Sequence, residues 1–491
     1  MKQRPVVIQG GMGVAVSNWV LARAVSQCGQ LGVVSGTALD QMLARRLQDG
    51  DPGGHMRRAM DRFPFRAMAQ RVWDTYYVPG GKAAGRPYKP LPLRTVDSPR
   101  SLIELIVVGN FVEVWLARDG HDGLVGINYL EKIQIPHLPS FYGAMLAGVD
   151  YVLMGAGIPM KVPGALDRLA NHELATYPIH VVGSSADDEA AAVVFDPREY
   201  MEHDLAPLPR PQFLAIISSS LLGQTLIKRA NGYVDGFVVE GPTAGGHNAP
   251  PRGKPTFNDD GEPIYGERDV VDLEKMAALG RPFWMAGGWG TAAKLQECLA
   301  AGAAGIQVGT AFAFCEESGL RADYKRALLD KAIDGTIRVY TDPLASPTSF
   351  PFKVAQLDGT MSARDVYEAR RRVCDLGYLR EVYRGADGSL GYRCPSEPVH
   401  AYVSKGGNVA ETVGRKCVCN GLMANAGHPQ VRGASAEVGI VTAGDDLAQI
   451  ARFLAPGQTT YGAADVIAHL LSGVGTSAPV RPAASEELAP A

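Results

Sequence analysis

The sequence predicts an α/β fold, a (β/α)8 TIM barrel with insertions and a carboxyl-terminal extension. Short apolar runs without alternation, such as FVV at 237–239, recur between amphipathic helical segments. This pattern is typical of parallel strands that are covered on both faces. Eight such strands fall within roughly 310 residues, which suits a barrel that carries insertions. An open doubly wound sheet is the alternative.

Along the sequence, the predicted strands alternate with helical segments. The first helix is expected to begin near Ser17 or Asn18, because either side chain can cap it. For the fifth strand, 213–217 competes with 179–182, and we prefer 213–217 because 179–182 and 192–195 can pair as an inserted hairpin. The eight expected strands are 6–9, 31–35, 124–129, 151–154, 213–217, 235–240, 283–286 and 305–308.

The chain divides into three predicted parts. The barrel takes 1–340, with insertions at about 51–97 and 178–210, and the extension at 341–475 is expected to pack on it. The segment VPGGKAAGRPYKPLPL in the first insertion is too rich in proline and glycine for a regular element. The proline-rich passage 341–353 is interpreted as packing against the barrel, with a substrate-side wall as the alternative. The tail 476–491 is poor in large apolar side chains and is expected to be disordered.

Composition restricts the partners and the compartment. Lys and Arg number 48 and Asp and Glu 51, a formal net charge of −3, so no basic surface indicates nucleic acid or an anionic membrane. No apolar run of about 18 residues predicts a membrane-spanning helix. The 7 cysteines follow no secretory signal, which favours the reducing cytoplasm. We therefore expect a small-molecule substrate; a homodimer is also compatible with the sequence.

Four late cysteines allow two interpretations. Cys417 and Cys419 are two residues apart and could bind one metal ion together with Cys374 and Cys394. The spacing is not that of a standard metal motif, and buried free thiols are common. No metal ligand is therefore assigned.

Five strand ends carry glycine or polar residues: 9–13, 126–128, 244–247, 286–290 and 309–312. In a barrel these ends meet at one mouth. The last two offer bare backbone N–H groups at helix starts, which predicts a monophosphate cradle at Gly287, Gly288, Gly309 and Thr310. A monophosphate there indicates flavin mononucleotide (FMN), whose ring would be bordered by Gln9, Met12 and Asn128.

The stretch 234–247, VDGFVVEGPTAGGH, organises the predicted site. Gly245 and Gly246 let a backbone approach a ligand closely, because they lack a Cβ and tolerate positive φ. His247 follows directly, in a loop at the end of a strand. It is either a functional histidine or a satisfied loop residue.

The motifs QGGMG, GIN, VVEG with AGGH, MAGG and GIQVGTAF, in this order over about residues 5–320, resemble the nitronate monooxygenase family, formerly called 2-nitropropane dioxygenases. Flavin-dependent enoyl-acyl-carrier-protein reductases share its fold and glycine motifs. The resemblance implies FMN as cofactor, a catalytic His247, and ring contacts at Gly11, Met12 and Asn128, beside the phosphate contacts named above. NAPPRG at 248–253 replaces the usual glycine after the histidine. The insertions and extension are similar to a long branch that includes trans-acting enoyl reductases.

The resemblance implies an oxidoreductase with one of two activities. The first is oxidation of alkyl nitronates by O2 to a carbonyl compound and nitrite, in which His247 holds the nitro group or removes the α-proton of a neutral nitroalkane. The alternative is an NAD(P)H-dependent enoyl-thioester reductase that acts in trans with a polyketide or fatty acid synthase, with acyl carrier protein as partner. A third hypothesis is a barrel that binds flavin or a phosphorylated metabolite without turnover, which the intact histidine disfavours.

Overall fold

A computed structural model describes residues 3–184 and 190–474 and contains an eight-stranded parallel sheet in the order β1-β12-β11-β9-β8-β4-β3-β2. The two outer strands meet through a parallel bridge between Ile8 and Leu31, where Gln9 N–H donates to Leu31 O at 2.9 Å. The sheet therefore closes, which confirms the predicted barrel. Its strands are β1 Val7–Gln9, β2 Gly32–Ser35, β3 Val125–Leu130, β4 Tyr151–Gly155, β8 Gln212–Ile217, β9 Gly236–Glu240, β11 Phe283–Ala286 and β12 Gly305–Val308.

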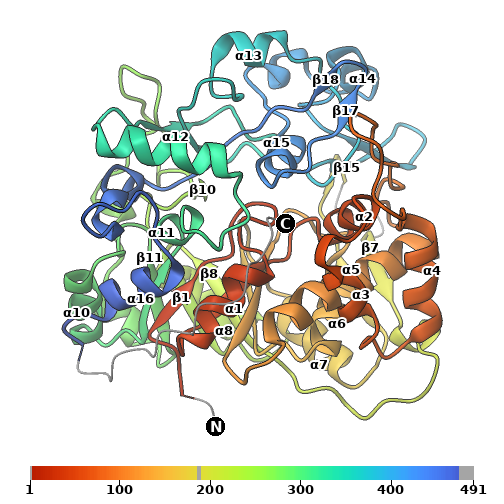
Figure 1. Ribbon diagram of the computed structural model, residues 1–491, viewed down its shortest axis with the longest axis horizontal. Coiled ribbons are helices and arrows are strands. Elements are labelled where there is room, and N and C mark those ends of the chain that lie inside the picture. Colours follow the sequence, from red (N-terminus) through yellow and green to blue (C-terminus); the bar gives the residue numbers. More distant parts are fainter. Residues whose placement is uncertain (1–2, 185–189, 475–491) are drawn as a thin grey trace.

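Helices surround the sheet (Figure 1). Asn18 caps the first of them, since its Oδ1 accepts from Leu21 N–H at 2.9 Å. The last helix, α16 at Ala463–Leu471, packs against α1 and α10 with an apolar face that includes Val466 and Ile467. It thus fills the outer layer beside β12 and β1. The other barrel helices are α1 Trp19–Gln27, α5 Arg100–Arg118, α6 His137–Leu146, α7 Val162–Ala170, α8 Ser220–Arg229, α9 Leu273–Ala277 and α10 Ala292–Ala300.

The barrel interior is a packed apolar core. Trp284 is 1% exposed and its indole N–H donates to Pro5 O at 2.9 Å, so it plugs the end of the barrel from which the strands start. Tyr151, Leu153 and Val238 belong to the same cluster. The outward-facing side chains of the strands pack under the helices in a second, larger cluster. This two-sided burial explains the unbroken apolar runs in the sequence.

Two segments interrupt the barrel alternation. After β2 come α2 Leu39–Gln48, the 3-10 turn η1 Pro52–Gly54, α3 His55–Met60, α4 Arg66–Tyr76 and an irregular passage that includes the predicted glycine- and proline-rich segment. After α7, β5 Ala175–Pro178 pairs antiparallel with β7 Ala192–Phe195. The hairpin was predicted to start at 179 but starts at 175, because Ala175–Pro178 supplies the alternating buried face. β6 Val181–Val182 instead pairs with β15.

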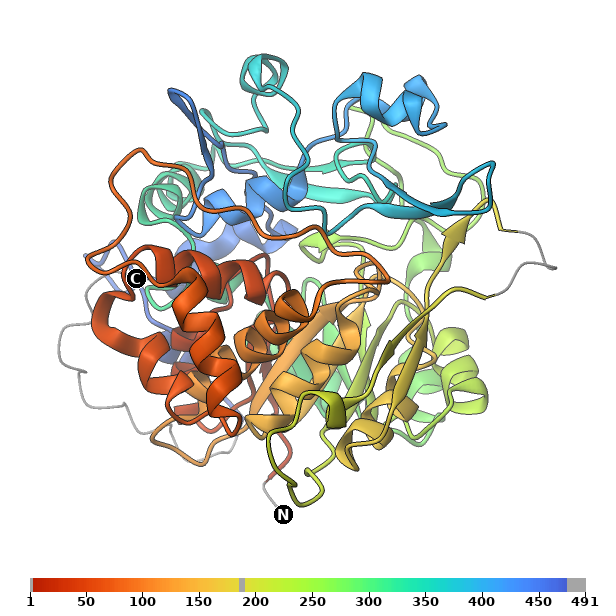
Figure 2. The same ribbon diagram turned by 90° about the vertical axis from the view of Figure 1, so that its right-hand side faces the viewer.

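Most of the remaining elements lie over one end of the barrel (Figures 1 and 2). β10 Gly246–His247, β14 Phe352–Ala355 and β13 Val339–Asp342 form one small sheet, and β16 Leu390–Arg393, β15 Glu381–Arg384 and β6 form another. The other elements are η2 Pro197–Glu199, η3 Glu267–Asp269, α11 Thr310–Ala313, α12 Ala322–Ile333, α13 Arg364–Ala369, α14 Val399–Ser404, η4 Val409–Thr412, α15 Val418–Asn425, β17 Val431–Arg432, β18 Ser435–Ala436 and η5 Asp445–Phe453. The tail predicted to be disordered, 476–491, lies outside the described residues.

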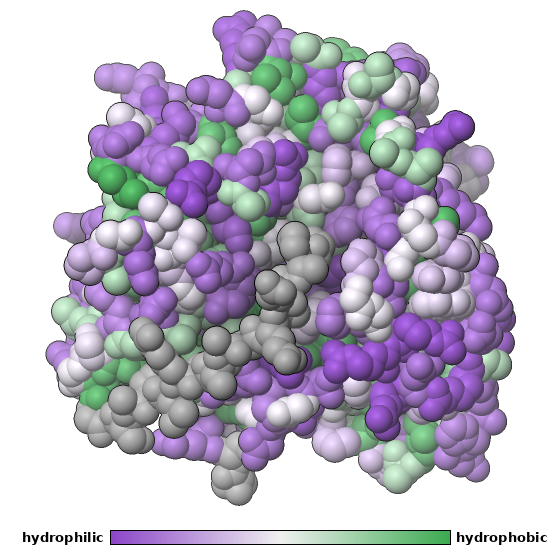
Figure 3. Space-filling model, in the orientation of Figure 1, coloured by the Kyte–Doolittle hydropathy of each residue, from purple (hydrophilic) through white to green (hydrophobic). Residues whose placement is uncertain are grey.

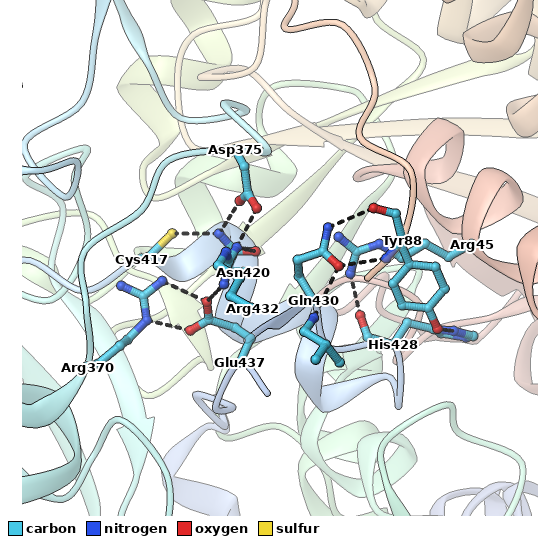
Figure 4. Close-up of polar contacts among 11 residues, drawn as sticks. Arg45, Tyr88, Arg370, Asp375, Cys417, Asn420, His428, Gln430, Arg432 and Glu437 are labelled. Atoms are coloured by element: carbon cyan, nitrogen blue, oxygen red, sulfur yellow. Dashed lines mark hydrogen bonds and ion pairs between the residues drawn. The ribbon is translucent and has the colours of Figure 1, made fainter. Parts of the chain in front are cut away.

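Polar contacts tie the segment after α15 to the first insertion (Figure 4). Gln430 exchanges two hydrogen bonds with the backbone of Tyr88, at 2.8 and 3.1 Å, and Arg45 donates to His428 O. Tyr88 and His428 both bond to Asp49.

On the far side of α15, two arginines and an asparagine hold the acidic side chains around it. Glu437 accepts from both Arg370 and Arg432, and Asp375 accepts from Arg432 and from Asn420 at 2.7 Å. These contacts fix the position of α15, which forms part of the cavity described below.

The face drawn in Figure 3 carries mostly hydrophilic side chains, with apolar ones in small groups. Within residues 3–184 and 190–474, no helix has both the length and the apolar character needed to cross a membrane.

Candidate functional site

One cavity of about 220 Å³ opens at the carboxyl ends of the barrel strands. The structure brings the ten predicted site residues together in its lining: Gly11, Met12, Asn128, Gly245, Gly246, His247, Gly287, Gly288, Gly309 and Thr310. Gln9, which was expected to border the ring, does not line it. Its amide is fully buried and bonds to Gly10 O, Ser17 Oγ and Val33 N–H, so it links β1 to its neighbours instead.

The floor of the cavity depends on close packing between β1 and β3. A Cβ at Gly11 would lie 2.4 Å from Asn128 Cβ, so a glycine is required there. Met12 Sδ would lie 3.4 Å from a Cβ at Gly309 and so adjoins the eighth strand end. These contacts leave the Asn128 side chain along the cavity wall.

The four residues predicted to form a phosphate cradle all line the cavity. Gly287 and Gly288 have φ of 78° and 74°, and a Cβ at Gly287 would lie 2.9 Å from Gly241 O. Thr310 starts α11, and its Oγ1 accepts from Gly444 N–H at 2.9 Å. No lysine or arginine is among the described residues that line the cavity, so an anion here would be held by N–H groups.

Asp446, from η5, borders the cradle and was missed by sequence reasoning. Burial raises the pKa of its carboxyl, while Arg452, at 4.0 Å, acts in the opposite direction. The carboxyl also accepts from the Gly290 backbone. No local signal marks Asp446, because it is more than a hundred residues beyond the barrel motifs.

His247 is held by the extension. β10 pairs antiparallel with β14, and His247 Nε2 lies 2.7 Å from the Oγ of the fully buried Ser346. Phe352 packs against the imidazole with ring centroids 4.8 Å apart. Burial, with a smaller effect of Lys132, lowers the pKa of His247 to about 4, so the ring is neutral at pH 7. Since Nε2 is occupied, Nδ1 remains for a ligand.

Glu240 is a second titratable group that sequence reasoning missed. It ends β9 and lines the cavity, and burial raises the pKa of its carboxyl to about 7. A carboxyl with this pKa changes its protonation state near neutral pH and can act as an acid or a base. The sequence feature that could have identified Glu240 is its position at the end of an apolar strand, directly before a glycine.

In the lining of the cavity, two buried amide oxygens have no partner among the residues that the structure describes. They are Gln307 Oε1 and Asn425 Oδ1, and both residues line the cavity. Buried acceptors without partners are rare in folded proteins. They suit a ligand that carries hydroxyl or N–H donors, as the ribityl chain and ring of FMN do.

The extension supplies much of the opposite wall. The N–H of Gly246 donates to Thr442 Oγ1 at 2.8 Å, and Val418, Cys419 and Leu422 of α15 face the cavity. The passage 341–353, interpreted from sequence as packing, reaches the site through Ser346 and Phe352. Phe352 is thus both packed and part of the cavity wall, and the role of this passage toward a substrate stays a prediction.

The late cysteines are free thiols, as are the other cysteines of the described chain. Cys374 hydrogen-bonds to Cys394, and Cys419 faces the cavity. In residues 3–184 and 190–474, no group of three or more His, Cys, Asp or Glu side chains is arranged to hold a metal ion.

Residues 176–342 match the family model described as Nitronate monooxygenase. The match confirms the resemblance predicted from the strand-end motifs, and with it an enzyme of the oxidoreductase class. No curated protein matched the chain.

Similar solved structures share low identity. A nitroalkane oxidase from Streptomyces ansochromogenes has a TM-score of 0.46 and 17% identity, covering 95% of each chain. FabK from Thermotoga maritima has a TM-score of 0.45 and 15% identity, covering 96% of this chain and 92% of that one. The enoyl reductase domain of MlnA from the macrolactin biosynthesis cluster of Bacillus amyloliquefaciens has a TM-score of 0.36 and 13% identity, covering 72% and 64%.

Proposed function

We propose that this chain, which carries a nitronate monooxygenase-family segment, is an FMN-dependent oxidoreductase that oxidises alkyl nitronates with O2 to a carbonyl compound and nitrite. The observation that carries the proposal is the neutral His247, whose Nδ1 has no hydrogen-bond partner among the described residues, beside a cavity lined by the glycine-rich strand ends. We place the protein in the reducing cytoplasm, where its cysteines would stay free thiols.

The cavity residues fit FMN in three respects. Gly287, Gly288, Gly309 and Thr310 would hold the phosphate through backbone N–H groups and a hydroxyl. The unpartnered amide oxygens accept from donor groups, while Met12 and Asn128, with Gly11, would border the ring. When bound, FMN supplies the redox chemistry and accepts electrons from the substrate.

His247 acts on the substrate's acidic carbon or its nitro group. A neutral imidazole can remove the α-proton from a nitroalkane at Nδ1, and positioned general-base catalysis contributes about 10²- to 10⁴-fold. Ser346 fixes the ring orientation through the 2.7 Å contact at Nε2. Phe352, Val418 and Leu422 exclude water from the same space, which strengthens the polar contacts inside it.

An enoyl-thioester reductase is the second candidate. The observation in its favour is a further chamber of about 200 Å³ on the other side of His247, which is larger than a short nitronate needs. In that reaction His247 would protonate or polarise the substrate near the thioester carbonyl. NAD(P)H would be the reductant and an acyl carrier protein the partner.

An anaerobic titration separates the two functions. The purified protein is tested for a bound yellow flavin, and ethylnitronate is added to one sample and NADH or NADPH to another. A change of the flavin spectrum with nitronate alone, followed by nitrite when air is admitted, supports the monooxygenase. Bleaching by NAD(P)H without a response to nitronate contradicts it and favours the enoyl reductase.

A further inference from the structure

The chamber beside the cavity shares a wall with it. Ala156, Ile216, Glu240 and His247 line both spaces. The two spaces are therefore adjacent at His247, where the reacting end of a substrate would lie. This geometry is independent of which group reacts.

The chamber is largely apolar and has room for a chain. Its volume of about 200 Å³ exceeds the roughly 150 Å³ of a cavity that binds benzene, so about eight non-hydrogen atoms fit. The segment 248–253, where the sequence departs from the family pattern, forms one side of it. The apolar lining comes from Ile158, Ile217, Leu222, Pro242, Pro250 and Phe350.

Asn248 places an unused acceptor in this lining. The residue is 1% exposed, its Nδ2 donates to Ala244 O at 3.0 Å, and its backbone N–H donates to Pro351 O at 2.9 Å. Its Oδ1 has no partner among the described residues. A buried acceptor of this kind is costly unless a ligand donates to it.

Arg252 places a positive charge at the chamber rim. Its Nη1 donates to Arg268 O at 2.5 Å and its Nη2 to Ser218 O at 2.6 Å, so two carbonyls hold the guanidinium. In the described chain, no carboxylate lies within ion-pair distance of it; Asp269 instead accepts from the backbone N–H groups of Arg252 and Gly266. The fixed charge is therefore available to an anionic group.

We propose that this chamber binds the tail of the substrate: an apolar chain of about eight atoms that carries an N–H or O–H donor for Asn248 and ends in a carboxylate or phosphate at Arg252. The position of the reacting end at His247 rests on the proposed function. The binding of the tail does not. Substrates are therefore predicted to be anionic amphiphiles rather than short alkyl compounds.

Calorimetric titration of the purified full-length protein with octanoate, octyl phosphate and octanol tests the anionic preference. We expect both anions to bind about tenfold more tightly than octanol, since one charge-assisted contact contributes about 1.5 kcal/mol. Arg252→Gln should remove this difference, while Arg364→Gln, at an exposed arginine of α13, should preserve it. Equal binding of octanoate, octyl phosphate and octanol to the unmodified protein would overturn the anionic assignment.

A second pair of variants tests whether the probes bind inside the chamber. Leu222→Trp fills the chamber and should abolish binding of all three probes, whereas Leu221→Trp, at a neighbour that is 70% exposed, should leave binding intact. N-pentanoyl-β-alanine, which adds an N–H donor to an anionic chain, should bind more tightly than octanoate. Unchanged binding in Leu222→Trp would show that the probes bind elsewhere and would refute the site.

Ethylnitronate distinguishes this proposal from the proposed function, because it is too short to need the chamber. Nitrite formation from ethylnitronate without octanoate binding would refute the chamber alone. Octanoate binding that Arg252→Gln weakens, without nitrite formation, would support the chamber and refute the nitronate activity.

Discussion

His247 and Ser346 are 99 positions apart in the chain, yet their side chains meet with 2.7 Å between Nε2 and Oγ. The strand pairing of β10 with β14 brings them together. The barrel supplies the histidine, and the extension decides which ring nitrogen faces the cavity. The two segments therefore form one functional site.

His247→Ala is predicted to retain flavin and to lower turnover by about 10²- to 10⁴-fold, because the general base is lost while the cradle is untouched. Flavin absorbance per protein and the initial rate measure the two effects. His400→Ala, at an exposed histidine of α14, is the control and should change neither. Normal turnover in His247→Ala would remove the assigned role.

Ser346→Ala is predicted to reduce turnover by roughly tenfold, because a lost hydrogen bond costs about 1 kcal/mol and frees the ring to rotate. The rate at saturating substrate should fall more than the flavin content. An unchanged rate would show that Phe352 and the backbone suffice to orient the imidazole.

Gly288→Asp is predicted to expel the cofactor. The position has a φ of 74°, and a Cβ would lie 2.9 Å from Thr243 Oγ1. The added carboxylate would also repel a phosphate. Gly335→Asp is the matched control, since Gly335 has a φ of 70° and a Cβ added there would meet no atom within 4 Å. Equal flavin content in both variants would contradict the cradle.

Glu240→Gln is predicted to change the pH dependence of stability. Burial raises the pKa of Glu240 to about 7, so the folded state holds this proton more tightly than the unfolded state does. Its contribution to stability is therefore present below the ordinary glutamate pKa and is lost as pH rises through about 7. The free energy of unfolding of the variant, relative to that of the original protein, should therefore rise by on the order of 1–3 kcal/mol from pH 5 to pH 8. Urea unfolding at both pH values measures this difference. The same change in stability from pH 5 to pH 8 in both proteins would refute the prediction.

Trp284→Ala is predicted to destabilise the barrel by about 3–5 kcal/mol, because it leaves a cavity at the closed end and an unpaired Pro5 carbonyl. Trp115→Ala, on the partly exposed face of α5, should cost clearly less. Chemical denaturation gives both values. Similar losses would mean that Trp284 does not support the barrel core.

Much of the barrel was predictable because its signals are local. The eight strands lie within one or two residues of their expected positions, and Asn18 caps the first helix as one of the two expected residues. The ten predicted site residues share one cavity because carboxyl ends of parallel strands meet at one edge. Their individual roles stay predictions.

The remaining features depend on contacts between distant segments. Ser346 and Asp446 reach the site only through strand pairing and packing, which no local pattern encodes. Gln9 is a polar residue at a strand end, as a site residue would be. Its side-chain amide instead accepts from Val33 N–H, where β1 adjoins β2. The domain boundary expected near 340 also remains a prediction, and the hairpin register shifted by four residues because two apolar stretches compete for one partner.

The helix α16 makes the barrel dependent on residues far from its strands. It covers the flank of α1 and α10, so two segments more than 400 positions apart must meet to cover that apolar surface. Contacts of such long separation form late, because the intervening chain must first be ordered. A nascent or shortened chain that ends before 463 would expose an apolar strip along the barrel wall and would tend to aggregate or to occupy chaperones.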